Sequence, residues 1–202
     1  SGEGFLSSGL VINFAQSADS IDVNVTVTPS SDTAASVSVP ASVYNNVTAG
    51  RVVTIKVTNS DGSTSQGVNK TALALPSGGS IQTYSGYRSH KFTSSGTWTN
   101  TFVTSADVLI VAGGGGGGAD RAGGGGAGGL VYLSNYPVTD TTGYSITVGT
   151  GGSGAPPSTK GGNGSNSIFN SQYYTEGGGG GGTSHPGTRD GNPGGSGGGG
   201  SL

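Results

Sequence analysis

The sequence contains no cysteine and no methionine, and its apolar runs are short. Without cysteine the chain cannot form disulfides, zinc–thiolate sites, iron–sulfur ligation or a thiol nucleophile. Without methionine we expect a processed chain or a segment of a longer protein. The longest strongly apolar run, Val108 to Ala112, is far too short to cross a bilayer, so no membrane insertion is expected.

Charge of either sign is also scarce. Asp, Glu, Lys and Arg make up 9% of the chain, against about 25% in typical globular proteins, and the formal net charge is -2. The 8 lysines and arginines are scattered singly, without the basic stripe that nucleic-acid binding requires. We therefore expect no nucleic-acid partner.

Glycine is abundant instead, and it is unevenly distributed. It supplies 44 of 202 residues, of which 10 lie in residues 1–100 and 34 in residues 101–202. This shift in composition divides the chain into two halves. We predict a first domain at residues 1–80 and a glycine-rich domain at residues 81–202.

The first half shows the alternation of short antiparallel strands. In Ile21–Val27 the apolar side chains Ile21, Val23, Val25 and Val27 share one face, and polar residues share the other. Three more segments show comparable alternation, namely 10–14, 35–39 and 52–57. Strands at this spacing, separated by Asn, Asp, Pro and Gly, predict an Ig-like β-sandwich with almost no helix.

The second half alternates apolar strands with glycine tracts. Residues 107–112 are apolar on both faces, which predicts a buried central strand. The tracts lie at 113–118, 123–126, 177–182 and 197–200, and shorter strands are expected at 130–133, 144–148 and 167–169. A flexible linker would not be interrupted by such strands. We predict an all-β chain whose tracts form polyproline-II-like segments packed side by side or against the strands.

Such a composition matches glycine motifs by chance. Gly113, Gly115 and Gly118 follow a strand as in a dinucleotide site, yet no helix follows to hold the phosphates. Residues 194–198 fit GxSxG without the strand and helix that a nucleophile elbow needs. The two histidines and the scattered carboxylates lack metal-ligand spacing. We expect no enzyme, no cofactor and no metal.

One glycine motif resembles a single calcium β-roll repeat. Residues 161–169 fit the nonapeptide, with Asn166 where an aspartate belongs. Such rolls need several stacked repeats to share each ion, so we interpret this copy as a turn leading into the strand at 167–169. Four N-x-S/T sequons are candidate glycosylation sites, at Asn24, Asn46, Asn69 and Asn163.

An ordered series of segments resembles a known family. Residues 86–98 and 107–118 are followed by GGGGAGGLVY at 123–132 and YSITVGTGGSG at 144–154. This order is similar to that of the glycine-rich domain in viral (phage) tail-fibre and surface-fibre proteins. The resemblance covers roughly residues 84–200. It implies an extracellular or virion-surface component, structural or adhesive, and no catalytic residue.

Two functions follow as expectations. The first is a structural subunit that assembles with copies of itself into an extracellular fibre or filament, helical or trimeric. The segment 9–15 is then a candidate strand for completing a neighbour's sheet. The second is an adhesin module at a fibre tip that binds a cell-surface glycan or protein receptor. Ice binding by a flat polyproline-II face is a remote third alternative.

The resemblance also indicates which residues would contact a receptor. In related tail-fibre adhesins, loops between polyglycine segments touch the host, and the corresponding loops here are 119–122, 155–160 and 183–193. Exposed tyrosines of the second half could also stack on sugars, a group that includes Tyr132, Tyr136 and Tyr144. The candidate contact residues are Asp120, Arg121, Lys160, Tyr173, Tyr174, His185 and Arg189.

Overall fold

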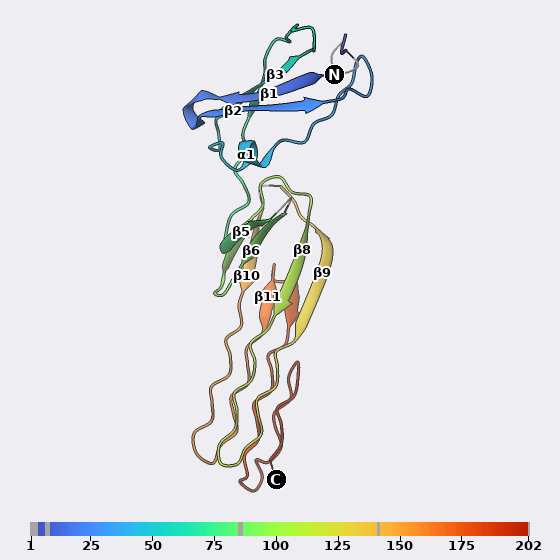
Figure 1. The fold of residues 1–202 in the computed structure, drawn as a ribbon. Helices are drawn as coiled ribbons and strands as arrows, with labels where there is room; N and C mark the ends of the chain where they lie inside the picture. Colours follow the sequence, from blue (N-terminus) through green and yellow to red (C-terminus); the bar gives the residue numbers. More distant parts are fainter. Residues whose placement is uncertain (1–3, 7–8, 85–86, 141, 202) are drawn as a thin grey trace. The chain divides into compact units, whose positions relative to one another are not determined.

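A computed structural model describes residues 4–6, 9–84, 87–140 and 142–201 (Figure 1). The chain folds into two compact units, Ser1–Leu75 and Pro76–Leu202. The sequence-based boundary between residues 80 and 81 falls shortly after this division. Both units are built from antiparallel strands with very little helix, so the predicted all-β fold class is confirmed.

The first unit contains one four-stranded sheet of order β2-β1-β3-β4. Its strands are β1 (Leu10–Gln16), β2 (Ile21–Val27), β3 (Val52–Thr58) and β4 (Val68–Thr71). A 3-10 turn, η1 (Ser17–Asp19), connects β1 to β2, and a single-turn helix, α1 (Ala41–Tyr44), lies between β2 and β3. The predicted alternation of Ile21–Val27 is present, because its odd-numbered residues face the core.

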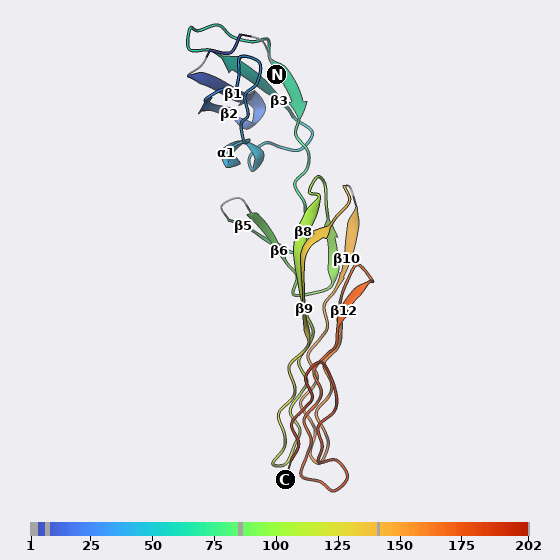
Figure 2. The same cartoon turned by 90° about the vertical axis from the view of Figure 1, so that its right-hand side faces the viewer.

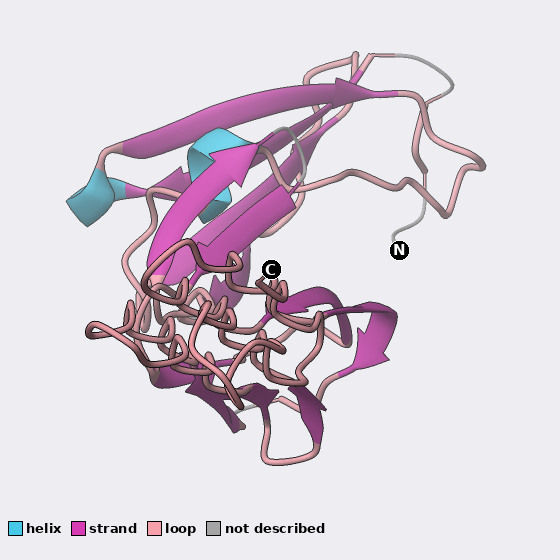
Figure 3. Ribbon diagram, turned by 90° about the horizontal axis from the view of Figure 1, so that it is seen from below, coloured by secondary structure: helices cyan, strands magenta, loops and turns pink. Residues whose placement is uncertain are grey.

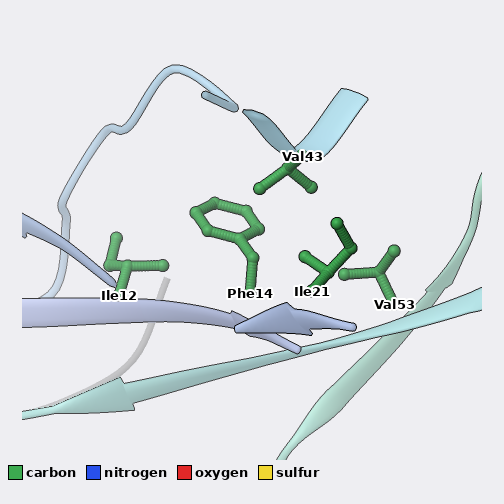
Figure 4. Close-up of a cluster of buried hydrophobic side chains, with 5 residues drawn as sticks. All are labelled: Ile12, Phe14, Ile21, Val43 and Val53. Atoms are coloured by element: carbon green, nitrogen blue, oxygen red, sulfur yellow. The ribbon is translucent and has the colours of Figure 1, made fainter. Parts of the chain in front are cut away.

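The core of this unit lies on one face of the sheet (Figure 4). Strand residues Ile12, Phe14, Ile21 and Val53 meet Val43, which α1 supplies from the opposite side. The described residues of this unit contain one sheet. The layer that covers its core face is formed by α1 and the chain leading to α1, in place of the second sheet of a β-sandwich.

Two expectations for the first unit are wrong. Residues 35–39 partly alternate in burial and Val37 packs against the core, but no described strand runs beside them, so they form no strand. The segment 9–15 is not free to complete a neighbour's sheet. Its strand β1 pairs with β2 on one side and β3 on the other, and its apolar side chains are the core of its own unit.

The second unit carries the remaining strands and all the long glycine tracts. Its strands are β5 (Ser80–Tyr84), β6 (Tyr87–Lys91), β7 (Gly96–Thr99), β8 (Ser105–Val111), β9 (Leu130–Pro137), β10 (Gly143–Thr147), β11 (Ser167–Phe169) and β12 (Tyr173–Thr175). They form a four-stranded sheet of order β12-β11-β10-β7 and two hairpin sheets, β5-β6 and β8-β9.

The core of the second unit is aromatic. Trp98, Tyr144 and Phe169 of the four-stranded sheet pack with Ile110 of β8 and with Val138, which follows β9. The rings of Tyr144 and Phe169 are stacked with centroids 5.7 Å apart.

Strand β8 is not the doubly buried strand that its sequence predicts. Ile110 is buried, but Leu109 and Val111 are 61% and 51% exposed, because β8 has a packed layer on one face only.

The glycine tracts continue directly from the strands. Figures 1 and 2 show them running side by side away from β8 to β12, and Figure 3 views them from their far end. We call this assembly the glycine bundle. It comprises residues 112–129, 149–166 and 177–201.

Candidate functional site

The tracts of the glycine bundle are joined by backbone hydrogen bonds that repeat every third residue. The amides of Gly115 and Gly118 donate to the carbonyls of Gly126 and Gly123, at 2.8 and 3.1 Å. A three-residue repeat is that of a polyproline II helix, which has no internal hydrogen bonds and therefore bonds to its neighbours. The predicted side-by-side packing of the tracts is confirmed.

Segment 112–118 bonds to tracts on four sides. It runs antiparallel to 123–129 and 161–166, to which it donates, and parallel to 149–155 and 177–182, from which it accepts. The strands therefore continue into a laterally cross-linked bundle. Such a bundle is stiff because bending one segment strains bonds to several others.

Glycine is required in the bundle for close approach. A Cβ at Gly113 or Gly116 would overlap the carbonyl oxygen of Thr150 or Ser153, and at Gly118 that of Gly182. None of the glycines of tracts 113–118, 123–126 and 177–182 has a positive φ, so the need is steric and not conformational. Segment 177–182 is buried along its whole length, and each of its glycines would overlap a neighbouring carbonyl or backbone atom if it carried a Cβ.

Two asparagines extend the hydrogen-bond pattern of the bundle. The Oδ1 atoms of Asn163 and Asn166 accept the amides of Gly180 and Gly177, each at 3.0 Å. These residues belong to the nonapeptide that resembles a calcium repeat, and here they join two tracts. The sequence signal for this role is the three-residue spacing of the two asparagines, which matches the repeat of the glycine tract opposite them. The interpretation of residues 161–169 as a simple turn did not include this role.

The loops at the far end of the bundle contact one another. We define the end loops as residues 119–122, 155–160 and 183–193. The backbone amide of Ser158 donates to Oδ2 of Asp120 at 2.6 Å, and the hydroxyl of Ser201 donates to the carbonyl of Arg121 at 2.6 Å. The amide of Ser201 donates to the carbonyl of Arg189 at 2.9 Å. Loops far apart in sequence thus form one surface.

Five of the candidate contact residues lie in these end loops. Asp120, Arg121, His185 and Arg189 are exposed, whereas Lys160 is half-buried with Nζ 3.5 Å from Oδ1 of Asn192. Asp120 and Arg121 have φ values of 60° and 54°. Both are therefore in the left-handed region, which is costly for residues other than glycine and which occurs often at ligand sites.

The two tyrosines among the candidates lie elsewhere, on β12. The ring of Tyr173 is half-buried and meets that of Tyr136 edge-on at 5.5 Å, whereas Tyr174 is 58% exposed. Tyr144 is buried in the core. The five tyrosines are therefore not exposed together, because three of them, Tyr136, Tyr144 and Tyr173, pack inward.

Tyr132 is exposed on β9, across the sheet from Leu109 of β8. A hydrogen bond to the nearby Asp107 carboxylate, with smaller contributions from burial and the negative charge, raises the pKa of Tyr132.

The four sequon asparagines are exposed, and their side chains are hydrogen-bonded. Oδ1 of Asn24 accepts from Asn13, and Oδ1 of Asn69 accepts from Thr54. The Nδ2 atom of Asn46, to which a glycan would attach, donates to the carbonyl of Ser42. Asn163 lies within the bundle contacts described above.

The described residues contain no group of three or more His, Asp or Glu side chains close enough to hold a metal ion. Nδ1 of His90 lies 2.8 Å from the carbonyl of Gly78, and its ring meets Trp98 edge-on. Helices long and apolar enough for a membrane span are also absent from the described part of the chain.

Comparison with known proteins identifies the second unit. Searches of curated proteins and of solved structures return no match to the chain. A family model described as a glycine-rich domain matches residues 91–202, more than half of the chain. This region holds the glycine bundle and strands β7 to β12. The chain therefore belongs to the glycine-rich domain family.

Proposed function

We propose that the chain is a structural subunit of an extracellular fibre or filament, of the kind represented by phage tail fibres. The observation that carries this proposal is the hydrogen-bonding of segment 112–118 to tracts on four sides. A segment that is hydrogen-bonded to tracts on four sides resists bending. This property suits a part of a fibre that bears load or holds other parts at a fixed distance. The ordered series of glycine-rich segments, similar to that of tail-fibre proteins, supports the same function.

The location of the chain in its source tests this function. Antibodies raised against residues 76–202 are used for immunogold labelling of intact virions or cells in the electron microscope. We expect gold particles along or at the ends of extracellular fibres. Labelling confined to the cell interior would contradict the proposal, and pre-immune serum is the control.

An adhesin module is the second candidate, and the joining of the end loops favours it. Residues from three loops form one surface, and most of the charged side chains of the bundle lie there. A stiff bundle that holds exposed and backbone-strained loops at its end is a good platform for recognition. The ligand class is a polar cell-surface glycan or protein.

Binding to whole cells or to a glycan array tests the adhesin function. Arg121→Ala combined with Arg189→Ala removes two exposed cations of the end loops, and we expect at least about tenfold weaker binding. Lys70→Ala, at an exposed position on β4 of the first unit, is the matched control. Unchanged binding by the double variant would argue against recognition through these cations.

A further inference from the structure

The outward face of β8 and β9 carries four large apolar side chains that no described part of the chain covers. Leu109, Val111, Leu130 and Tyr132 are 61%, 51%, 62% and 57% exposed. They form two cross-strand pairs, Leu109 with Tyr132 and Val111 with Leu130, so they adjoin one another. Single exposed apolar residues are ordinary, but a contiguous group on one face is typical of an interaction surface.

This apolar group continues into an outward row of the glycine bundle. A Cβ at Gly114 or Gly117 would have its nearest neighbour at 3.6 or 3.9 Å, and one at Gly124 would have none within 4 Å. Ala127, on the same segment as Gly124, carries a Cβ and is exposed. Packing within the chain therefore does not require glycine at these three positions.

Glycine is unfavourable where it is not needed, because it raises the entropy of the unfolded chain. No described residue accepts a backbone hydrogen bond from the amides of Gly114, Gly117 or Gly124. The row is therefore flat and free of side chains, and its amides are not bonded within the bundle. A surface of this kind fits a partner whose side chains protrude.

We propose that a second copy of this chain is that partner. The docking face comprises an apolar half (Leu109, Val111, Leu130, Tyr132) and a flat half (Gly114, Gly117, Gly124, Ala127). Two copies pack antiparallel about a two-fold axis perpendicular to the strands, which passes near Gly113, so that each apolar half covers the flat half of the other. Because the interface is isologous, it closes as a pair.

The two halves match in length. Leu109 and Val111 are two residues apart, ~7 Å at ~3.3 Å per residue, and Gly114 and Gly117 are three residues apart, ~9 Å at the ~3.1 Å rise of polyproline II. With the two-fold axis at Gly113, Leu109 and Val111 of one copy therefore lie over residues 115–117 of the other.

The alternative orientation, with the two copies parallel, fits less well. In that orientation Leu109 and Tyr132 would lie against the same residues of the other copy. The two glycine rows would then be held apart, because sheets that carry side chains stack ~10 Å from each other. The parallel orientation would also bring the exposed Asp107 of one copy toward Asp107 of the other, and opposed like charges are destabilising.

The expected pair is weak. A face that runs from Leu109 to Gly117 is ~25 Å long and ~10–15 Å wide, so it buries roughly 500–750 Å² over both copies, below the ~1,200 Å² of standard specific interfaces. This pairing rests on the proposal that the chain assembles with copies of itself, and it adds the face and the orientation. Higher assembly would use other surfaces.

Analytical ultracentrifugation over a range of concentrations tests the pairing. We expect a monomer–dimer equilibrium that Leu109→Lys weakens ~10-fold or more, because a charge would be buried without a partner. Leu73→Lys is the matched control, since Leu73 is 64% exposed in the first unit, outside the docking face. A monomer at every concentration, or a dimer equally sensitive to both variants, would overturn the proposal.

Cysteine cross-linking tests the orientation. Because the sequence contains no cysteine, only the introduced cysteines can form a disulfide. In the antiparallel pair Leu109 of one copy lies over Gly117 of the other. Within one chain these residues are ~25 Å apart along the segment, too far for a disulfide. We expect a mixture of Leu109→Cys and Gly117→Cys chains to form a mixed dimer on oxidation, faster than either variant alone.

Preferential cross-linking of Leu109→Cys to itself would overturn the antiparallel orientation in favour of the parallel one. These results are independent of the immunogold labelling. A chain found on fibres but monomeric in solution contradicts only the pairing, whereas a dimer found inside cells contradicts only the fibre function.

Discussion

At the residue scale, glycine has two different roles in one tract. In segment 112–118 the glycines that face neighbouring tracts allow backbones to touch, whereas Gly114 and Gly117 face outward with room for a methyl group. The difference follows from the three-residue repeat, which turns successive positions toward different neighbours. Composition alone cannot separate these roles, because every position is glycine.

Adjacent alanine substitutions test this distinction. Gly118→Ala would place a methyl group on the carbonyl of Gly182, and we expect a loss of ~1–3 kcal/mol or more in the free energy of unfolding. In Gly117→Ala the nearest atom to the new methyl group is 3.9 Å away, so the change should stabilise the chain by ~0.4–1 kcal/mol, because the unfolded state loses entropy. Chemical denaturation of dilute protein measures both, and equal effects would contradict the packing.

Asp19 is a second residue whose environment makes a testable difference. Its carboxylate accepts the amide and the hydroxyl of Thr48, at 2.8 and 2.9 Å, and lies 3.0 Å from Nη1 of Arg51. The hydrogen bond from the Thr48 amide, followed by that from the Thr48 hydroxyl and the Arg51 charge, lowers the pKa of Asp19 below its ordinary value of 3.8 and outweighs the opposing effect of burial.

A lowered pKa in the folded state means that ionised Asp19 stabilises the first unit. This stabilisation is complete above pH 3.8 and is lost as the pH falls through the lower folded-state pKa. We expect Asp19→Asn to be less stable at neutral pH and to show a flatter acid dependence, as measured by thermal unfolding. Asp190→Asn in an end loop is the control. Asp61, whose pKa is lowered by hydrogen bonds from Ser63, adds a dependence of the same sign in every variant.

At the element scale, side chains of the glycine bundle complete what the backbone leaves open. Asn163 and Asn166 accept amides of the buried segment 177–182, and the hydroxyl of Ser167 accepts the amide of Gly149 at 2.9 Å. The tracts thus depend on a few polar residues at defined spacing.

Removal of one such acceptor should be costly. In Asn163→Ala the buried amide of Gly180 loses its acceptor, and we expect a loss of ~1–3 kcal/mol in the free energy of unfolding. Asn163→Asp keeps an acceptor at the same place and should retain most of the stability. Denaturation of both variants, with and without a calcium chelator, measures the effect. A chelator effect on the wild-type chain would instead support the calcium interpretation.

At the scale of the whole molecule, charge contributes little to stability. Among the described residues one ion pair is present, between Asp19 and Arg51 in the first unit. The second unit is held by its aromatic core and by backbone hydrogen bonds. Both are insensitive to the ionic screening that weakens surface charge pairs.

Salt should therefore have little effect on the second unit. Between ~0.05 and ~0.5 M sodium chloride, screening of charges becomes much stronger, yet we expect its melting temperature to shift by only a few degrees. The fluorescence of Trp98, the one tryptophan and a core residue of this unit, reports its unfolding specifically. A large decrease in melting temperature with salt would contradict this expectation and would show that electrostatic contacts stabilise the second unit.

Local pattern in the sequence was enough to predict most strands and the glycine bundle, although residues 35–39 form no strand. Alternation predicts strands such as Ile21–Val27, and the glycine tracts interrupted by strands predict packed polyproline-II segments. The positions of the end loops also follow from the chain order, because each lies between two tracts. Their contacts, such as Asp120 with Ser158, do not follow from it, because they join residues far apart in sequence.

Which faces are covered depends on the tertiary fold. The run Val108 to Val111 is uniformly apolar, and whether one or both of its faces are buried depends on layers from elsewhere in the chain. Tyr144 and Tyr174 are alike in sequence terms, but one lies in the core and the other in solvent. Local pattern sets the conformation of the backbone, while burial depends on packing between residues far apart in sequence. The surface of the end loops and the docking face therefore follow from the tertiary fold alone.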